Sequence, residues 1–261
     1  MLGPLQGIED TALRVLDRLH IKGPLRRLLA ATPAAPLLRQ REIRNRPRLV
    51  REVELFELYK AALRLAGRGG EIGDYLEFGV YNGTALVTMH KALLATGNRH
   101  SRLFGFDSFE GLPDFATTDC GGHWRPGEFA SSLEYTMSVL DYEQVDRSRV
   151  ALVKGYFSDT CTAEQREALH LRKASVVMVD CDLYRSTVEA LAFAAPVLAD
   201  PAVILFDDWY PLAHRRMGER QAFEEWLLAN PAYSATEWRE FEPYGKAFIL
   251  NRGYARISVT E

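Results

Sequence analysis

The chain has 261 residues, 47% of them hydrophobic, and a formal net charge of −3. A chain of this length and composition can bury one large core, so we expect a single α/β domain with an N-terminal extension. Residues 1–50 hold ten Lys and Arg against four Asp and Glu, which leaves the remaining chain at −9. Nucleic-acid binding needs a concentrated basic face, so the acidic body argues against nucleic acid and favours a small-molecule acceptor.

Cys120, Cys161 and Cys181 are far apart and form no CxxC pair, so the sequence predicts neither a zinc site nor a redox pair. Free thiols of this kind are typical of a reducing compartment. No apolar run in the sequence approaches the roughly 20 residues that cross a bilayer, and no secretory signal pattern is present. We therefore expect a cytoplasmic protein with no transmembrane segment.

The first fifty residues predict a helical arm, separate from a domain at residues 51–261. Leu13, Leu16 and Leu19 have helical spacing, and an Arg-rich stretch runs from Arg39 to Arg48. A basic amphipathic arm can lie on a membrane surface. Packing on the domain or on a second subunit accounts better for the apolar spacing, so we expect the arm to contribute to a homo-oligomer.

The remaining sequence alternates between strand and helix patterns. The predicted elements are, in chain order, helix Val50–Ala66, strand Asp74–Phe78, helix Thr84–Leu94, strand Arg102–Phe106, a long loop Ser108–Ala130, helix Leu133–Tyr142, strand Val150–Lys154, strand Ser175–Val179, helix Thr187–Leu198, strand Ala202–Phe206, helix Glu219–Leu228, and two segments around Thr236 and over Lys246–Asn251. Strands that alternate with helices predict a doubly wound, mostly parallel sheet, and the last two segments predict an antiparallel hairpin at one edge.

A glycine-rich turn follows the first predicted strand. Its spacing is ExGxxxG, and its candidate cofactor contacts are Glu77, Gly79, Tyr81, Gly83 and Thr84. Glycines there permit a tight turn and a close approach of the backbone to a ligand. The spacing lacks the GxGxxG fingerprint for dinucleotides and resembles the first motif of S-adenosylmethionine-dependent methyltransferases. Such turns are also common for purely structural reasons, so the motif alone is weak.

The next two strands end in further candidate cofactor residues. Asp107 and Ser108 follow the second strand, where a carboxylate can accept hydrogen bonds from both ribose hydroxyls. The alternative is that Asp107 only opens a turn. Tyr156, Phe157 and Asp159 follow the third strand, where an adenine is expected. Asp159 is equally suited to cap a helix N-terminus.

The strongest signal lies after the fourth and fifth strands. Asp180 and Asp182 end one strand, and Asp207 and Asp208 end the next. Four carboxylates at neighbouring strand tips repel one another, and a hard divalent cation such as Mg²⁺ removes that cost. The alternative is that one or two of them are turn residues or helix caps, although Ser186 already offers a cap for the following helix.

At this point the ordered motifs resemble a known family. The order LEFGVYNG, FGFDSFEGLPD, VKGYFSDT, VDCDLYRST and ILFDDWY, between Asp74 and Asn251, is similar to the macrocin O-methyltransferase family (the TylF and MycF type). The resemblance implies a class I, Rossmann-like methyltransferase that uses S-adenosylmethionine and Mg²⁺ on sugars of antibiotics and related natural products. It implies that Asp180, Asp207 and Asp208 hold the metal, that Asp182 is the general base, and that Glu77, Gly79, Asp107 and Asp159 touch the cofactor. We count Asp180 as a further candidate cofactor contact.

We therefore predict O-methylation of a small-molecule hydroxyl, with a sugar or related diol as acceptor. The loop that holds His123 and Trp124 is expected to close over the acceptor, and His123 is a spare candidate base whose plainer interpretation is an exposed loop residue. The alternative enzyme is a nucleotide-sugar glycosyltransferase that uses Asp180-Cys181-Asp182 as a DxD motif. A non-catalytic binding module is a third hypothesis, but it predicts missing carboxylates, and all four are present.

Overall fold

The computed structural model describes residues 35–47, 51–215 and 217–253. The chain divides into two compact units, Met1–Pro47 and Arg48–Glu261. In the first unit, helix α3 spans Ala35–Arg44 and carries Arg41 and Arg44 in its last turn. The leucines used to predict the arm lie outside the described residues, so its part in an oligomer stays a prediction.

The second unit is built on a seven-stranded sheet in the order β3-β2-β1-β4-β5-β7-β6. The strands are β1 Asp74–Phe78, β2 Leu103–Asp107, β3 Val150–Lys154, β4 Ala174–Val179, β5 Leu198–Phe206, β6 Tyr233–Phe241 and β7 Gly245–Arg252. β1 to β5 pair in parallel, and β7 joins β5 and β6 antiparallel. The predicted doubly wound sheet with an edge hairpin is therefore confirmed. The strand order reverses between β1 and β4, which is where such sheets bind ligands.

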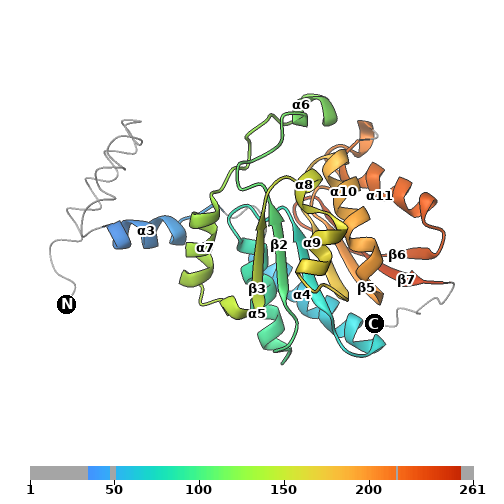
Figure 1. The fold of residues 1–261 in the computed structure, drawn as a ribbon, viewed down its shortest axis with the longest axis horizontal. Helices are drawn as coiled ribbons and strands as arrows, with labels where there is room; N and C mark the ends of the chain where they lie inside the picture. Colours follow the sequence, from blue (N-terminus) through green and yellow to red (C-terminus); the bar gives the residue numbers. More distant parts are fainter. Residues whose placement is uncertain (1–34, 48–50, 216, 254–261) are drawn as a thin grey trace. The chain divides into compact units, whose positions relative to one another are not determined.

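Helices cover both faces of this sheet. The longer ones are α4 Glu52–Ala66, α5 Thr84–Ala95, α7 Leu133–Tyr142, α10 Tyr184–Ala194 and α11 Gly218–Ala229, and the short ones are α6 Ala116–Asp119, α8 Phe157–Thr160 and α9 Ala163–Ala168. Figure 1 shows α9, α10 and α11 on the near side of the sheet, with α4 and α5 behind it. Among the residues with assigned positions, no helix is long and apolar enough to span a membrane.

The helix predicted at Thr187–Leu198 differs from the structure at both ends. α10 begins at Tyr184 and ends at Ala194, a 3₁₀ turn spans Ala195–Val197, and β5 already begins at Leu198. Pro196 accounts for the early end, because its ring removes a backbone donor and clashes with the preceding helical turn. The short helices α6, α8 and α9 were not predicted from the sequence.

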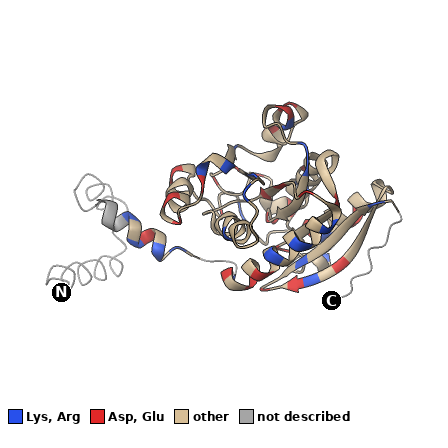
Figure 2. Cartoon of the chain, turned by 90° about the horizontal axis from the view of Figure 1, so that it is seen from below, with Lys and Arg blue, Asp and Glu red and all other residues tan. Residues whose placement is uncertain are grey.

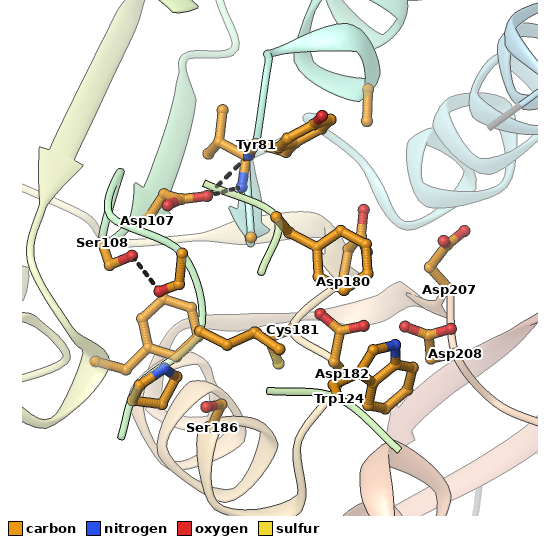
Figure 3. Close-up of a pocket in the computed structure, with 18 of the residues that line it drawn as sticks. Tyr81, Asp107, Ser108, Trp124, Asp180, Cys181, Asp182, Ser186, Asp207 and Asp208 are labelled. Atoms are coloured by element: carbon orange, nitrogen blue, oxygen red, sulfur yellow. Dashed lines mark hydrogen bonds between the residues drawn. The ribbon is translucent and has the colours of Figure 1, made fainter. Parts of the chain in front are cut away.

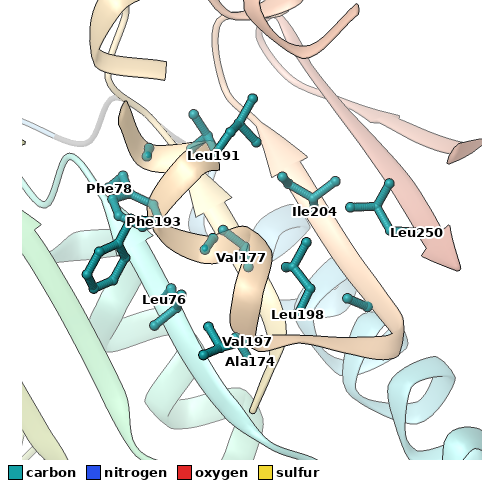
Figure 4. Close-up of a cluster of buried hydrophobic side chains, with 14 of the residues drawn as sticks. Leu76, Phe78, Ala174, Val177, Leu191, Phe193, Val197, Leu198, Ile204 and Leu250 are labelled. Atoms are coloured by element: carbon teal, nitrogen blue, oxygen red, sulfur yellow. The ribbon is translucent and has the colours of Figure 1, made fainter. Parts of the chain in front are cut away.

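The main core lies between β1, β4 and β5 and the helices α10 and α11. Leu76 and Phe78 of β1 face this side, as strand alternation requires, while Tyr75 and Glu77 face the other. The Phe193 ring of α10 packs against Phe106, with the centroids 4.9 Å apart. Figure 4 shows Phe193 beside Phe78. Truncation of a buried Phe costs about 3–5 kcal/mol, so these rings contribute strongly to the stability of this core.

The free edge of the hairpin is protected by charge. Glu237, Arg239 and Glu240 lie on the edge strand β6, and Lys246 of β7 pairs with Glu237 at 2.8 Å. Figure 2 shows blue and red residues interspersed along this hairpin. Charged side chains on an edge strand oppose pairing with another chain, so β6 terminates the sheet.

Candidate active site

A cavity of about 520 Å³ lies beyond the carboxyl ends of the parallel strands, within the range typical of small-molecule sites. It brings together eleven of the residues predicted from the sequence (Figure 3): Gly79, Tyr81, Thr84, Asp107, Ser108, Tyr156, Phe157, Asp180, Asp182, Asp207 and Asp208. These residues come from five different strand ends or the turns that follow them. Glu77, Gly83 and Asp159 do not line the cavity.

The turn after β1 requires glycine at its first position. Gly79 has φ +91°, and a Cβ built there would lie 1.7 Å from the carbonyl oxygen of Asp180. The turn of β1 therefore packs directly on the tip of β4. Gly83, with φ +82°, forms the N-cap of α5, and its Cβ position faces Thr136 at 3.2 Å. Gly79 thus shapes the cavity wall, whereas Gly83 permits the packing of α5 beside α7.

Glu77 lies beneath the cavity wall, with no exposed surface. Tyr75 donates a hydrogen bond to Glu77 Oε2 at 2.7 Å, and the hydroxyls of Tyr59 and Tyr75 are 2.8 Å apart. Glu77 Oε1 has no hydrogen-bond partner within the described residues. Burial raises the pKa of Glu77 to about 8, with a further contribution from the charge of Asp107. Its contact with the cofactor stays a prediction.

Asp107 organises the turns around it. Its Oδ2 accepts hydrogen bonds from the amides of Val80 and Tyr81 at 2.7 and 2.8 Å, and its Oδ1 accepts one from Phe109 at 2.6 Å. Burial raises the pKa of Asp107, and these amide bonds oppose that rise. Asp107 therefore does open a turn, as its alternative interpretation expected. A carboxylate has about four acceptor positions, so ribose binding from the cavity wall stays compatible with it and untested.

Tyr156 and Phe157 line the cavity at the end of β3, while Asp159 lies in α8 outside the lining. The N-cap of α9 is Thr162, whose side chain accepts the amide of Gln165 at 3.1 Å. The alternative role of Asp159 as that cap is therefore wrong. The charge of Asp159 instead contributes to the raised pKa of Glu189, after burial. Contact of Asp159 with adenine stays a prediction, and Asp159 does not line the cavity.

The four aspartates come together at the tips of β4 and β5. These strands pair in parallel with Val179 opposite Phe206, which sets the following residues side by side. In Figure 3 the carboxyl groups of Asp182 and Asp208 face each other, with Asp207 beside Asp208. The carboxyl group of Asp182 hydrogen-bonds to that of Asp208. The predicted carboxylate cluster is thus present in the cavity.

Burial and mutual repulsion dominate the electrostatics of this cluster. Burial raises the pKa of Asp180 and Asp182 well above the usual range, and the neighbouring carboxylates raise it further. Burial and the charge of Asp208 raise the pKa of Asp207 to about 8. Burial raises the pKa of Asp208 as well, while the hydrogen bond from Asp182 and the charge of His123 lower it. A cation at this place would relieve the repulsion.

The donor chemistry suits a hard divalent ion. Asp207 Oδ1 is buried and has no hydrogen-bond partner among the described residues. Oxygen ligands from carboxylates are what Mg²⁺ binds. No group of three or more His, Cys, Asp or Glu side chains in the described part of the chain is already arranged as a metal site. The residues therefore fit a metal by type and place, while binding itself stays untested.

The open side of the cavity is formed by residues that are distant in sequence. His123 and Trp124 line it from the long loop, as predicted, and their rings pack edge to face with centroids 4.5 Å apart. The backbone amide of Trp124 donates to Cys120 Sγ at 3.0 Å, which holds the backbone of this part of the loop. Phe129 and Tyr244 also line this side but were not predicted. Tyr244 lies in the β6–β7 turn, and no sequence motif points to it.

Glu219 was placed by the sequence only as the start of a helix. The structure buries it completely and hydrogen-bonds it to the backbone of both strand tips that carry the aspartates. The sequence feature that could have pointed to Glu219 is the Gly218-Glu219 pair at the start of a predicted helix, where Glu219 lies eleven residues after Asp208.

Comparisons with known proteins identify a family and relatives of this chain. The model of a family described as macrocin-O-methyltransferase (TylF) matches residues 55–226. A curated relative from Streptomyces olivaceus is 29% identical over 146 residues, covering 54% of each chain, and is described as 8-demethyl-8-(2,3-dimethoxy-alpha-L-rhamnosyl)-tetracenomycin-C 4'-O-methyltransferase. A second, from Streptomyces niveus, is 29% identical over 144 residues, 52% of this chain and 53% of the relative, and is described as demethyldecarbamoylnovobiocin O-methyltransferase. The chain spans about half the length of the curated relatives it matches.

The fold of this chain is similar to that of solved structures. The structure of the O-methyltransferase NovP superposes with a TM-score of 0.63 at 22% identity, covering 77% of this chain and 81% of that one. At this identity the similarity concerns the fold, which is that of class I O-methyltransferases.

Proposed function

The chain belongs to the macrocin-O-methyltransferase (TylF) family, and from this premise we propose that it transfers a methyl group from S-adenosylmethionine to a hydroxyl of a small molecule, with Mg²⁺ held by Asp180, Asp207 and Asp208. The observation that carries the proposal is the position of these carboxylates, in the same cavity as the Gly79 turn and Asp107. In this proposal the cofactor and the cation share one cavity.

The acceptor class is proposed from the relatives. Two curated relatives are described as O-methyltransferases of tetracenomycin and novobiocin compounds, and one description names a rhamnosyl group. We therefore expect a hydroxyl on a sugar of a natural product, or a related diol. The aromatic side chains Trp124, Phe129 and Tyr244 line the open side of the cavity and suit the face of a ring.

Each residue has a defined part in this mechanism. The Gly79 turn and Asp107 would hold the cofactor. Its methyl–sulfur bond would break as the acceptor oxygen bonds to the methyl carbon, and S-adenosylhomocysteine would leave as a neutral thioether. Mg²⁺ held by Asp180, Asp207 and Asp208 would supply positive charge that favours the ionised form of a nearby hydroxyl. Asp182 accepts the acceptor's proton, and it lines the same cavity as the three proposed metal ligands. His123 and Trp124 orient the acceptor and exclude water, so positioning contributes much of the rate.

The decisive experiment measures methyl transfer from labelled S-adenosylmethionine to a panel of glycosylated and catecholic acceptors, with Mg²⁺ or with EDTA. We expect EDTA to abolish turnover, Mg²⁺ to restore it, and cofactor binding to survive in both conditions. Asp207→Asn should mimic chelation, whereas the control Asp141→Asn, on the exposed face of α7, should leave turnover unchanged. Full turnover in EDTA would contradict the metal-dependent mechanism.

The glycosyltransferase alternative is separated by calorimetric titration. We expect tight binding of S-adenosylmethionine and none of a nucleotide sugar. The reverse result would favour a DxD role for Asp180 and Asp182. A cytoplasmic location and a homo-oligomer remain predictions from the sequence.

A further inference from the structure

Glu219 is a buried acid to which the proposed mechanism gives no role. It lies in the first turn of α11 and has no exposed surface. A buried carboxylate is costly unless hydrogen bonds compensate it. Its hydrogen-bond partners therefore indicate what it contributes.

Both oxygens of Glu219 bind backbone amides at the carboxylate cluster. Cys181, between Asp180 and Asp182, donates its amide to Oε1 at 3.0 Å. Asp208 donates its amide to Oε2, also at 3.0 Å. One carboxylate thus connects the turn after β4 to the turn after β5. These two turns carry Asp180, Asp207 and Asp208, the proposed metal ligands.

The surrounding backbone is shaped to bring Glu219 to this place. Gly218 has φ +73°, and a Cβ there would lie 3.2 Å from Leu212 Cβ and 3.5 Å from the carbonyl oxygen of Asp182, so α11 begins directly against the turn. Asp182 itself has φ +62°, a sparsely populated conformation that persists only when its surroundings hold it. An acidic residue in the first helical turn is also favoured by the helix dipole.

We propose that Glu219 is a positioning residue that fixes the distance between the Asp180–Asp182 turn and the Asp207–Asp208 turn, and thereby sets the affinity of the cluster for a divalent cation. This inference rests on the proposed function. Glu219 touches neither cofactor nor acceptor in it, because it lies behind the cavity wall. It acts through the two amides that it holds.

Two substitutions separate position from charge. Glu219→Gln keeps the length of the side chain but has one acceptor oxygen, so it satisfies one amide and presents its own donor to the other. Glu219→Asp keeps the charge but is one methylene too short to reach both amides. If position matters, both variants lose cation affinity. If only the negative charge matters, Glu219→Asp keeps it.

The experiment titrates Mg²⁺ alone into the full chain by calorimetry and counts folded molecules by the stoichiometry of S-adenosylmethionine binding. We expect Mg²⁺ to bind both variants roughly 10- to 100-fold more weakly than the parent, the usual effect of removing a group that orients metal ligands. The control is Glu224→Gln, an exposed position of the same helix paired with Arg220, and its affinity should equal the parent's.

The outcomes are distinct. Parental Mg²⁺ affinity in Glu219→Asp would overturn the inference in favour of a charge effect, and parental affinity in both variants would overturn it while leaving the proposed function intact. A parent chain that binds no Mg²⁺ would overturn the metal dependence and the inference with it. Loss of cofactor stoichiometry in both variants would assign Glu219 to the fold, not to the spacing of the site, and would also overturn it.

Discussion

Glu77 offers a direct test of how burial sets protonation in this molecule. The perturbation is Glu77→Gln, which keeps the shape of the side chain and removes its ability to ionise. The pKa of Glu77 rises from 4.5 to about 8 because the carboxyl group is buried beneath the cavity wall. The hydrogen bond from Tyr75 can be accepted by either residue. The variant therefore resembles the protonated parent.

The direction of the pH dependence of stability follows from the raised pKa of Glu77. The folded chain holds the Glu77 proton more tightly than the unfolded chain, so the stabilising contribution is complete below about pH 4.5 and is lost as the pH rises to about 8. One pKa unit corresponds to about 1.4 kcal/mol. Over this window the parent should lose about 5 kcal/mol relative to the variant, and about 3 kcal/mol of that by pH 7.

The assay is urea unfolding of the parent and of Glu77→Gln at pH 5, 6, 7 and 8, without cofactor. We expect the difference in the free energy of unfolding to grow by about 1.4 kcal/mol per pH unit in favour of the variant. Glu57→Gln, an exposed position of α4, is the matched control and should change stability by under about 0.5 kcal/mol at every pH. A difference for Glu77→Gln that does not change with pH would refute the assignment of a protonated, buried Glu77.

Four further predictions concern the site and the arm. Asp107→Ala should weaken S-adenosylmethionine binding by about 2–4 kcal/mol in calorimetry, since hydrogen bonds to a charged group are lost; unchanged affinity would remove Asp107 from the cofactor site. Gly79→Ala should lower the melting temperature and abolish cofactor binding, because its Cβ would lie 1.7 Å from the Asp180 carbonyl. Asp182→Asn should leave Mg²⁺ affinity near the parent's and slow single-turnover methyl transfer by about 10²- to 10⁴-fold, and an undiminished rate would exclude it as the base. Deletion of residues 1–45 should lower the number of subunits per oligomer, measured by light scattering. An unchanged number of subunits would show that the arm is not the interface.

Local pattern was sufficient for the existence of the longer helices and the strands, and for the carboxyl ends of the parallel strands to within one residue. Buried apolar runs such as Ala174–Val179 have the length of a strand. Polar residues follow each run, at the carboxyl end of the strand. For this reason the sequence alone located Asp107, Asp180, Asp182, Asp207 and Asp208, all of which line the cavity. The DxD and DD motifs are short-range features that do not depend on how the strands are ordered.

Contacts between distant segments were decided only by the tertiary structure. Glu77 follows the rule of alternation and faces α4, so Tyr75 and the cavity wall bury it although it lies in the first motif. Tyr244 reaches the cavity because β7 pairs antiparallel with β5 and brings the hairpin turn to the same edge. Glu219 holds Cys181 across 38 residues of sequence and Asp208 across 11. The periodicity of the sequence determines which residues can face the core or end a strand. Which distant groups then meet follows from the packing of the whole sheet. Buried polar groups need hydrogen-bond partners, and a local sequence pattern does not identify a partner on a distant segment.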